Sequence, residues 1–533
     1  MVGNNELFDK GKVSKIIKII KMKIVFLLIT IVCFCILGCS NVKKEINIIT
    51  YKNDTDYIEY LKREDWDDFV KKSLNDLMNM YGKTKTGENN YVVFDFDNTC
   101  SIFDIEEQLA IYQLSKMAFN IKKEELANIL KTGLSNLDED LTDLGYGKGS
   151  YNDWIDDITN AYDYLYDEYG PFTAKGLDDD KEKEVINDPM WLEFATKMRT
   201  MYDLVYDNES ADVAYPWILY WFTGMTEDEV YNLAFKSHTF YKKAVSTKKT
   251  WTSPDTIDSK VGQVQYTYIA GIQVSENIIE LWKALRIAGI DVWVCSASSI
   301  DVVKAAVDVW GLHDYISGIL AMTNKIEKGK YINEYDYENG TYQKGLENGL
   351  WIKGKLFTRA ETQGVGKVTA INNTLFVEYG HGPIAGFMDS TGDYNFCTEY
   401  NTLKLVCCFN RASRKVTDGG GVIAEVAVYE EDILGYDLEK ANAVGDTLYV
   451  LQGRDENGLR SLRNSRKSII LGEVDEKLFA NENNEIQLTY IIDNKMKVKD
   501  IIDKFAIKTS SEESEIGFRY GFLNEYAGYH THD

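Results

Sequence analysis

Residues 91–99 of this 533-residue chain read Tyr-Val-Val-Phe-Asp-Phe-Asp-Asn-Thr. The apolar and aromatic run predicts a buried strand, and Asp95 and Asp97 follow at the point where the strand ends. In an alternating strand the two carboxylates point to the same side. They cannot both stay ionised in a dry pocket without a cation or a shared proton. The stretch therefore indicates a divalent-metal site, a nucleophile beside a general acid, or both, with a solvated turn as the alternative reading of the segment alone.

Three later segments repeat this pattern of a strand-like run followed by polar residues. Residues 292–299 read Val-Trp-Val-Cys-Ser-Ala-Ser-Ser, and a helix-like segment follows over 300–310. Residues 364–367 read Gly-Val-Gly-Lys and lead into an apolar-periodic segment, whereas residues 384–393 end in Asp389 and Asp393. Strands that alternate with helices predict an α/β fold with a parallel sheet, whose ligands collect at the carboxyl ends of the strands.

In these four segments the chain resembles the haloacid dehalogenase superfamily of phosphohydrolases. The resemblance covers residues 90–430 and rests on residues 95–99, Ser296, Lys367, and Asp389 with Asp393. One position departs from the family pattern, because Met388 stands where a glycine is usual. The resemblance implies a Rossmann-like parallel sheet flanked by helices, with a large, mostly helical cap inserted after the first motif.

The resemblance also implies a reaction. Asp95 would attack phosphorus and form an aspartyl-phosphate, which divides one difficult step into two easier ones. Asp97 would protonate the leaving oxygen and then take a proton from the hydrolytic water. Mg²⁺ would be held by the Asp95 carboxylate, the Asp97 backbone carbonyl and Asp389, because a hard cation prefers oxygen ligands. Asp393 would bind the metal, directly or through water, or hold the lysine of the third motif.

Four residues are expected to contact the substrate or shape its site. The resemblance implies that Ser296, with Ala297 beside it, and Lys367 bind phosphoryl oxygens. Lys367 is also expected to act in catalysis by offsetting the charge of the neighbouring carboxylates. Thr99 is expected to orient the first motif and so to contribute to substrate binding without reacting.

Several of these residues have structural alternatives. Ser296 could cap the helix that starts near Ile300, since serine is a favoured N-cap. Lys353 or Lys355 could take the role of Lys367, and Asp393 could be a surface acid.

The N-terminus predicts export. A basic stretch that ends at Lys23 precedes an apolar run over 24–37, which is too short to span a bilayer and suits a signal peptide. Residues 36–39, Ile-Leu-Gly-Cys, resemble the lipobox of bacterial lipoproteins, which implies lipidation of Cys39. The expected location is the bacterial cell envelope, with the protein exported and lipid-anchored; an uncleaved single-pass anchor is the alternative.

Charge and cysteine content limit the function. The net charge of −25 and the absence of a basic stripe argue against nucleic-acid binding. A phosphate site must then rely on local charge: Mg²⁺, Lys367 and backbone amides. Five of the eight cysteines lie beyond the lipobox, an odd number that cannot all pair, and their spacing does not indicate zinc. They are Cys100, Cys295, Cys397, Cys407 and Cys408.

The predicted cap is rich in aromatic residues, most of which we expect to be core. They are Trp154, Tyr162, Tyr164, Tyr166, Trp191, Tyr202, Tyr206, Tyr215, Trp217, Tyr220 and Trp221. A few could form a cage for a quaternary ammonium group, which the acids of residues 104–107 would face. In its first motif, acidic segment and large insertion the chain resembles bacterial phosphorylcholine phosphatases, and this implies phosphorylcholine as a substrate.

The motifs divide the chain into five segments. These are 1–39, signal peptide and lipobox; 40–100, linker and start of the core; 101–270, helical cap; 271–430, remainder of the core; and 431–533, a C-terminal extension. Local patterns predict a helix within 56–81, a capping box at 226–229, a strand over 403–409, a loop at 419–421 and a solvated polar loop at 452–458. The alternative for the last segment is that Arg454 reaches the substrate.

The predicted function is that of an exported, lipid-anchored, Mg²⁺-dependent phosphomonoesterase that acts on phosphorylcholine or a similar small phosphomonoester. The alternative from another class is a non-catalytic surface lipoprotein that binds a phosphorylated ligand. Phosphotransfer to an acceptor alcohol is a further possibility within the enzyme class, and the sequence leaves the oligomeric state open.

Overall fold

The computed structural model describes residues 56–336, 340–345, 351–356, 361–413, 419–458, 461–487 and 489–504. All of them belong to one unit, Ile49–Asp533. The predicted signal peptide, lipobox and Cys39 lie outside the described residues. None of the helices in the described ranges has the length and apolar character needed to cross a membrane.

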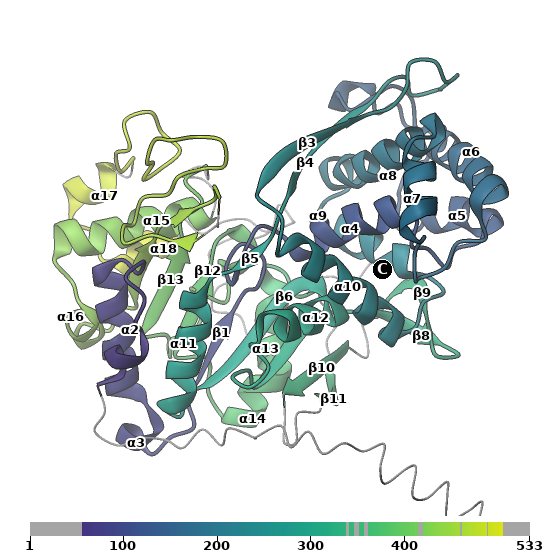
Figure 1. Cartoon of the computed structure of the whole chain (residues 1–533). Coiled ribbons are helices and arrows are strands. Elements are labelled where there is room, and N and C mark those ends of the chain that lie inside the picture. Colours follow the sequence, from purple (N-terminus) through teal and green to yellow (C-terminus); the bar gives the residue numbers. More distant parts are fainter. Residues whose placement is uncertain are drawn as a thin grey trace, which may run out of the picture. The chain divides into compact units, whose positions relative to one another are not determined.

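The central element of the described residues is an eight-stranded sheet (Figure 1). Its strands lie in the order β11 (Trp351–Leu356), β10 (Gly340–Gly345), β7 (Gly318–Met322), β6 (Asp291–Ser299), β1 (Tyr91–Phe94), β12 (Ala385–Met388), β13 (Leu405–Phe409) and β14 (Leu448–Gln452). The six strands from β7 to β14 run parallel, whereas β10 pairs antiparallel with both β7 and β11. The predicted α/β class, with a Rossmann-like parallel sheet, is confirmed.

Strand β1 lies in the middle of the sheet because both of its faces are apolar. Val92 and Phe94 belong to one buried cluster, and Tyr91 and Val93 belong to the cluster on the opposite face. Val92 is paired in register with a residue of β6 on one side and a residue of β12 on the other. A strand buried on both faces reads as a continuous apolar run, as residues 91–94 do.

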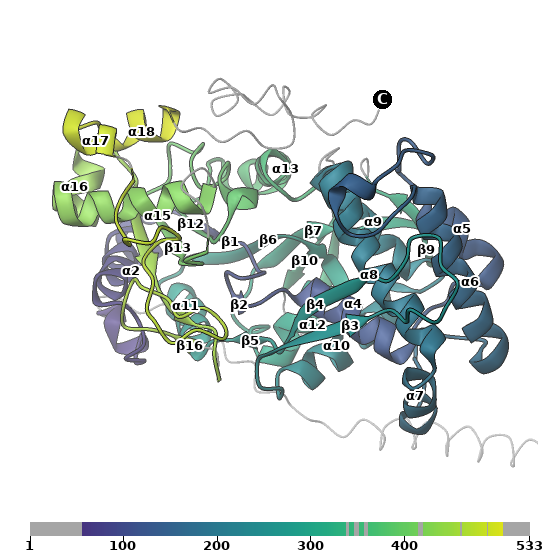
Figure 2. The ribbon, with the colours of Figure 1, turned by 90° about the horizontal axis from the view of Figure 1, so that it is seen from above.

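Helices cover both faces of the sheet (Figure 2). One face is covered by α2 (Asp68–Tyr81), α11 (Glu276–Ile287) and α12 (Ile300–Trp310), and the other by α13 (Val365–Ile371), α15 (Gly419–Tyr429) and α18 (Val498–Lys504). Helix α2 starts at Asp68, because the side chain of Asp67 accepts hydrogen bonds from the backbone of Phe69 and Val70. The helix expected within 56–81 is therefore limited to its second half, after a single 3₁₀ turn at Tyr57–Tyr60.

A large insertion separates β1 from β6. It contains α4 (Ile105–Lys116), α5 (Lys123–Leu130), α6 (Tyr151–Tyr169), α7 (Asp179–Ile186), α8 (Pro189–Asn208), α9 (Ala211–Leu219), α10 (Glu227–Tyr241) and a hairpin of β3 (Thr247–Thr252) and β4 (Gln265–Ala270). The chain leaves and re-enters the core side by side, because β2 (Ser101–Ile102) pairs with β5 (Gln273–Val274). The predicted capping box is confirmed: Thr226 and Glu229 exchange hydrogen bonds at the start of α10.

The remaining α-helices and β-strands of the described residues are short. They are α3 (Lys83–Thr86), β8 (Asn324–Glu327), β9 (Lys330–Tyr335), α14 (Val377–Tyr379), α16 (Leu438–Ala443), β15 (Arg454–Asp455), β16 (Ser461–Leu462) and α17 (Thr489–Asn494). The five cysteines in the described ranges are buried free thiols.

Two expectations need correction. The glycines at 419–421 do not form a loop but the first turn of α15. A Cβ atom on Gly420 would lie 2.3 Å from the backbone oxygen of Asp389, so only glycine lets the helix approach this closely. Strand β14 lies within the segment 431–533 and completes the parallel sheet, so the core extends beyond residue 430.

Candidate active site

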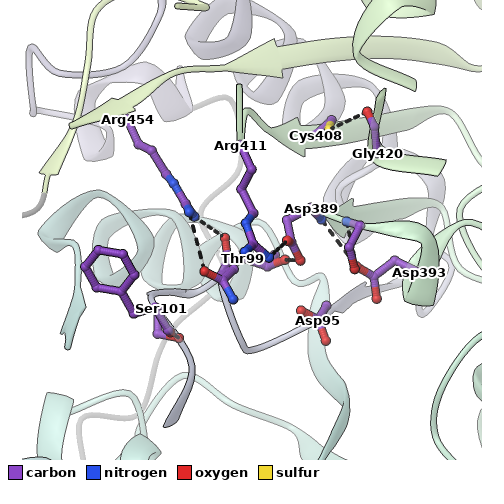
Figure 3. A network of polar contacts seen from close by, with 12 residues as sticks. Asp95, Thr99, Ser101, Asp389, Asp393, Cys408, Arg411, Gly420 and Arg454 are labelled. Atoms are coloured by element: carbon purple, nitrogen blue, oxygen red, sulfur yellow. Dashed lines mark hydrogen bonds and ion pairs between the residues drawn. The ribbon is translucent and has the colours of Figure 1, made fainter. Parts of the chain in front are cut away.

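Three carboxylates meet at the carboxyl edge of the sheet, and we call them the carboxylate cluster. Asp95 follows β1, Asp389 follows the adjacent strand β12, and Asp393 ends the 3₁₀ turn Thr391–Asp393. One oxygen atom from each lies within 4.8 Å of the others, and all three side chains are buried (Figure 3). The edge forms because Phe94 and Phe387 are register partners in parallel strands, which brings the residues that follow them together.

Lys367 lies in the first turn of α13 and points into the carboxylate cluster. Its Nζ atom is 2.6 Å from Asp95 Oδ1 and 2.6 Å from Asp393 Oδ1. Burial alone would lower the pKa of Lys367, but the charges of Asp393 and Asp95 outweigh it and raise this pKa well above its ordinary value. The ammonium therefore stays charged. The competing lysines, 353 and 355, lie on the edge strand β11.

Asp393 has both carboxylate oxygens engaged. Oδ1 accepts from Lys367, and Oδ2 accepts from the backbone N–H groups of Asp389 (3.2 Å) and Ser390 (3.4 Å). It is 1% exposed, which excludes a surface acid. Among the roles left open by the sequence, this geometry favours holding Lys367 and shaping the loop after β12.

Asp97 lies in a different environment from Asp95. Its Oδ2 atom accepts from the hydroxyls of Ser298 (2.7 Å) and Ser296 (3.3 Å), and Oδ1 accepts from the backbone N–H of Ile105 (2.7 Å). Burial and the charge of Asp95 raise the pKa of Asp97 to about 7, although the hydrogen bonds act in the opposite direction. A carboxyl group that binds and releases a proton near neutral pH is suited to general acid and base chemistry.

Ser296 and Ser298 both lie at the end of β6. Ser296 does not cap α12: the N-cap position is Ser299, and the Ser296 hydroxyl accepts from the backbone N–H of Ser298 at 3.1 Å. The sequence reasoning missed Ser298. The signal was present, because residues two apart in a strand point to the same side.

Thr99 and Ala297 have different surroundings. The Thr99 hydroxyl lies 3.4 Å from Asp389 Oδ1, so it braces the carboxylate cluster. Ala297 lines the cavity described below.

Two arginines reach this region from segments far along the chain. The sequence does not single out Arg411, and it predicts Arg454 at the substrate only as the alternative to a solvated loop. Arg411 follows β13, and its Nη1 atom is 2.9 Å from Asp389 Oδ2. Arg454 is 1% exposed; its Nη1 atom donates to the backbone oxygen of Asn98 (2.7 Å), and its Nη2 atom is 2.6 Å from Glu456. The expected solvated loop at 452–458 is therefore wrong at Arg454. This arginine fixes Asn98, whose φ of +61° lies in the left-handed region that most residues avoid.

A cavity of about 790 Å³ opens above the carboxylate cluster. Its core side is lined by Asp95, Asp97, Lys367, Asp389 and Arg411. The insertion side is acidic and aromatic, with Asp104, Glu106, Glu107, Tyr202, Asp203, Tyr206, Asp212, Tyr215, Tyr266 and Tyr268. Among the described residues that line the cavity, the cationic side chains are Lys367 and Arg411, and both lie on the core side.

The aromatic residues of the insertion divide into a core set and a cavity set, and Tyr166 is half-buried against the core. Trp154, Tyr162, Trp191, Trp217, Tyr220 and Trp221 are buried in the core, whereas Tyr202, Tyr206 and Tyr215 reach the cavity. Tyr164 is 46% exposed and does not line the cavity. The hairpin strand β4 adds Tyr266 and Tyr268, which the sequence reasoning missed.

The donor set fits a hard divalent cation. It consists of carboxylate oxygens, and the four acids Asp95, Asp97, Asp389 and Asp393 face only two cationic side chains within the described lining. Burial and the charge of Asp393 raise the pKa of Asp95 well above its ordinary value, even though Lys367 opposes the shift. The site is thus short of positive charge, which a divalent cation bound by oxygen ligands would supply.

Comparisons with known proteins support the fold. No protein-family model matches the chain, and no curated protein matches it. The crystal structure of a conserved functionally unknown protein from Anaerococcus prevotii DSM 20548 is similar with a TM-score of 0.60 and 24% identity, over 78% of this chain and 99% of that chain. A protein with unknown function from Bordetella pertussis Tohama I aligns over 68% of this chain and 98% of that chain, with a TM-score of 0.31 and 11% identity. The first match is a likeness of fold, and the argument for function rests on the site.

Proposed function

We propose that this protein is a Mg²⁺-dependent phosphomonoesterase of the haloacid dehalogenase type, which acts through an aspartyl-phosphate on Asp95. One observation carries the proposal: Asp95 lies in a buried carboxylate cluster 2.6 Å from the Lys367 ammonium, at the floor of a large cavity. A second carboxyl group, that of Asp97, lies two residues further on and accepts hydrogen bonds from the Ser298 hydroxyl and the backbone N–H of Ile105.

The contacts of Asp95 and Asp97 suit the two acids to different roles in the reaction. Asp95 Oδ1 is held by Lys367, so Oδ2 is the oxygen available to attack phosphorus. As the P–O bond to the leaving group breaks, Asp97 gives its proton to the leaving alcohol. Asp97 then takes a proton from water, which attacks the phosphorus of the aspartyl-phosphate and releases inorganic phosphate and the free Asp95 carboxylate.

The remaining groups bind and orient. The Asp95 carboxylate, the Asp97 carbonyl and Asp389 would hold Mg²⁺, which when bound offsets charge on the phosphoryl oxygens. Ser296 and Ser298 fix the Asp97 carboxyl group, and Asp393 holds Lys367 in place.

The cavity favours a substrate with a cationic leaving group, and phosphorylcholine fits this description. Tyr206 and Tyr215 have ring centroids 5.9 Å apart and line the cavity with Asp212. Aromatic faces with nearby acids bind quaternary ammonium groups. In this proposal Tyr206 and Tyr215 form the cage, because their rings pair at the wall of the cavity beside Asp212.

We propose further that the protein is exported to the cell envelope and anchored through lipid on Cys39. This rests on the signal-like and lipobox-like residues 24–39.

The proposal is tested by phosphate release from the purified full chain, with and without Mg²⁺. The substrates are phosphorylcholine, phosphoethanolamine, phosphoserine, a nucleotide and an aryl phosphate. Asp95→Asn removes the nucleophile, and Asp314→Asn makes the same change at an exposed acid outside the cavity. We expect Mg²⁺-dependent turnover that Asp95→Asn abolishes and Asp314→Asn leaves intact, with a preference for phosphorylcholine.

Other outcomes separate the alternatives. Turnover without that preference would contradict the cage and keep the enzyme. Folded protein that binds phosphorylated ligands without turnover would support the binding lipoprotein. An added alcohol that captures the phosphoryl group would indicate phosphotransfer.

A further inference from the structure

Arg411 stands at the carboxyl edge of the sheet without a place in the four sequence motifs. It lies two residues beyond the end of β13, and its guanidinium meets Asp389 at 2.9 Å (Figure 3). Its side chain is 27% exposed and lines the cavity. The ion pair with Asp389 therefore holds the guanidinium at the surface of the cavity.

The two cationic side chains of the cavity are not equivalent. Lys367 is 2% exposed and lies between two carboxylates at 2.6 Å each, so its charge is largely neutralised where it stands. Arg411 has one carboxylate partner among the described residues, Asp389, and a planar fork of five N–H donors. Donors of this fork beyond the one on Asp389 are suited to two oxygens of a single phosphoryl group.

The acidic lining of the cavity favours such a contact. A phosphomonoester carries about −1.5 to −2 charges at neutral pH. It would enter a cavity that Asp95, Asp97, Asp104, Glu107 and Asp389 line. Repulsion between these carboxylates and the substrate must be offset where the phosphoryl group binds, and Arg411 is the cation on that side with exposed surface.

We propose that Arg411 binds the phosphoryl oxygens of the substrate and of the inorganic phosphate product directly, while Asp389 positions its guanidinium. This inference rests on the proposed function and adds a substrate-binding residue to the same site. It differs from a purely structural role, in which Arg411 would only neutralise Asp389.

The test measures binding of inorganic phosphate to the full chain in the presence of Mg²⁺, by calorimetry, alongside steady-state kinetics and Mg²⁺ affinity. Arg411→Gln removes the charge, and Arg411→Lys keeps the charge but loses the fork. Arg63→Gln is the matched control, because Arg63 is exposed and lies outside the cavity.

We expect Arg411→Gln to weaken phosphate binding about 10- to 100-fold and to raise KM by a similar factor, as for a lost charge-assisted hydrogen-bond pair. Arg411→Lys should fall between wild type and Arg411→Gln, which also covers the case in which the glutamine variant folds poorly. Mg²⁺ affinity should change by less than the phosphate affinity, and Arg63→Gln should match wild type.

Two results would overturn the inference in different ways. Unchanged phosphate binding in both Arg411 variants, with tighter Mg²⁺ binding, would show that Arg411 only neutralises Asp389. Wild-type protein that neither binds phosphate nor hydrolyses any phosphomonoester would overturn the proposed function itself.

Discussion

At the scale of single residues, Asp95 and Asp97 lie two positions apart but have different hydrogen-bonding partners. Asp95 faces an ammonium group, whereas Asp97 faces two hydroxyls and a backbone N–H. Environments that separate the protonation behaviour of two carboxyl groups also separate their chemical roles. Under the proposed function, this difference in contacts assigns the role of nucleophile to Asp95 and that of proton carrier to Asp97.

Ser298 gives a prediction at this scale. Its hydroxyl lies 2.7 Å from Asp97 Oδ2, whereas that of Ser296 lies at 3.3 Å. We expect Ser298→Ala to lower kcat about tenfold with little change in KM, because a hydrogen bond of about 1.5 kcal/mol to the proton carrier is lost. Ser296→Ala should reduce kcat less. Steady-state kinetics on the preferred phosphomonoester decides, and equal or reversed effects of the two changes would contradict the reading.

The sequence was informative about residues that end or follow the strands, and silent about others. Asp95, Ser296 and Asp389 could be found because each lies at the end of, or directly after, an apolar run. Arg411 was not found and Arg454 was only the alternative to a solvated loop, because each reaches the site only through the pairing of β13 and β14 with strands far away in the chain. No local pattern marks an arginine for that role.

At the scale of secondary-structure elements, the insertion is joined to the core by a helix pair. Helix α10 of the insertion packs on α12 of the core, with His238 buried at the contact. The Nε2 atom of His238 lies 3.2 Å from the backbone oxygen of Val302, and its ring centroid is 5.8 Å from that of Trp310. Burial lowers the pKa of His238 to about 4, and the hydrogen bond to Val302 opposes this only in part.

This histidine predicts a pH dependence of stability. The unfolded chain binds a proton at His238 below pH 6.5, but the folded chain does so only near pH 4. Stability from this residue is therefore present above pH 6.5 and is lost as the pH falls to 4, by about 3 kcal/mol. We expect His238→Gln to be less stable than wild type at pH 7 and to lose less stability on acidification. Urea unfolding at both pH values measures this, and parallel losses would refute it.

Elements were predictable where a local signal defined their ends. The capping box at Thr226 placed the start of α10 correctly, since both partners lie within one turn. The prediction of a loop at glycines 419–421 was wrong. These glycines allow α15 to pack closely against the loop after β12, and such tertiary packing leaves no local pattern in the sequence.

At the scale of the whole molecule, the site is assembled from three distant parts of the chain. The core supplies the carboxylate cluster and Lys367, the insertion supplies the acidic and aromatic wall, and the segment after β14 supplies Arg454. The geometry of the first motif thus depends on a residue more than 350 positions later, as the Arg454–Asn98 contact shows (sequence separation 356).

Arg454 gives a prediction at this scale. Removing one partner of a buried ion pair leaves the other uncompensated, so we expect Arg454→Met to lower the free energy of unfolding by about 3 kcal/mol or more. Adding Glu456→Gln should recover part of the loss. Arg463→Met is the control: Arg463 pairs with Glu476 in the same segment but is 24% exposed, and its loss should cost about 1 kcal/mol or less.

Denaturant unfolding followed by tryptophan fluorescence measures these differences. Equal stability of the Arg454 and Arg463 variants would show that the buried pair is not the stabilising contact assigned to it. Phosphate release by the Arg454 variant adds a second readout under the proposed function, since Asn98 would no longer be held beside Asp95 and Asp97.

The spatial order of the strands determines how late in synthesis the candidate site can be assembled. Strand β1 is synthesised first but lies in the middle, and its neighbours β6 and β12 emerge from the ribosome only about 200 and 290 residues later. Arg454 follows later still. A growing chain therefore carries Asp95 and Asp97 for most of its synthesis without the strands and the arginine that align them. Under the proposed function, it would stay inactive until it is nearly complete.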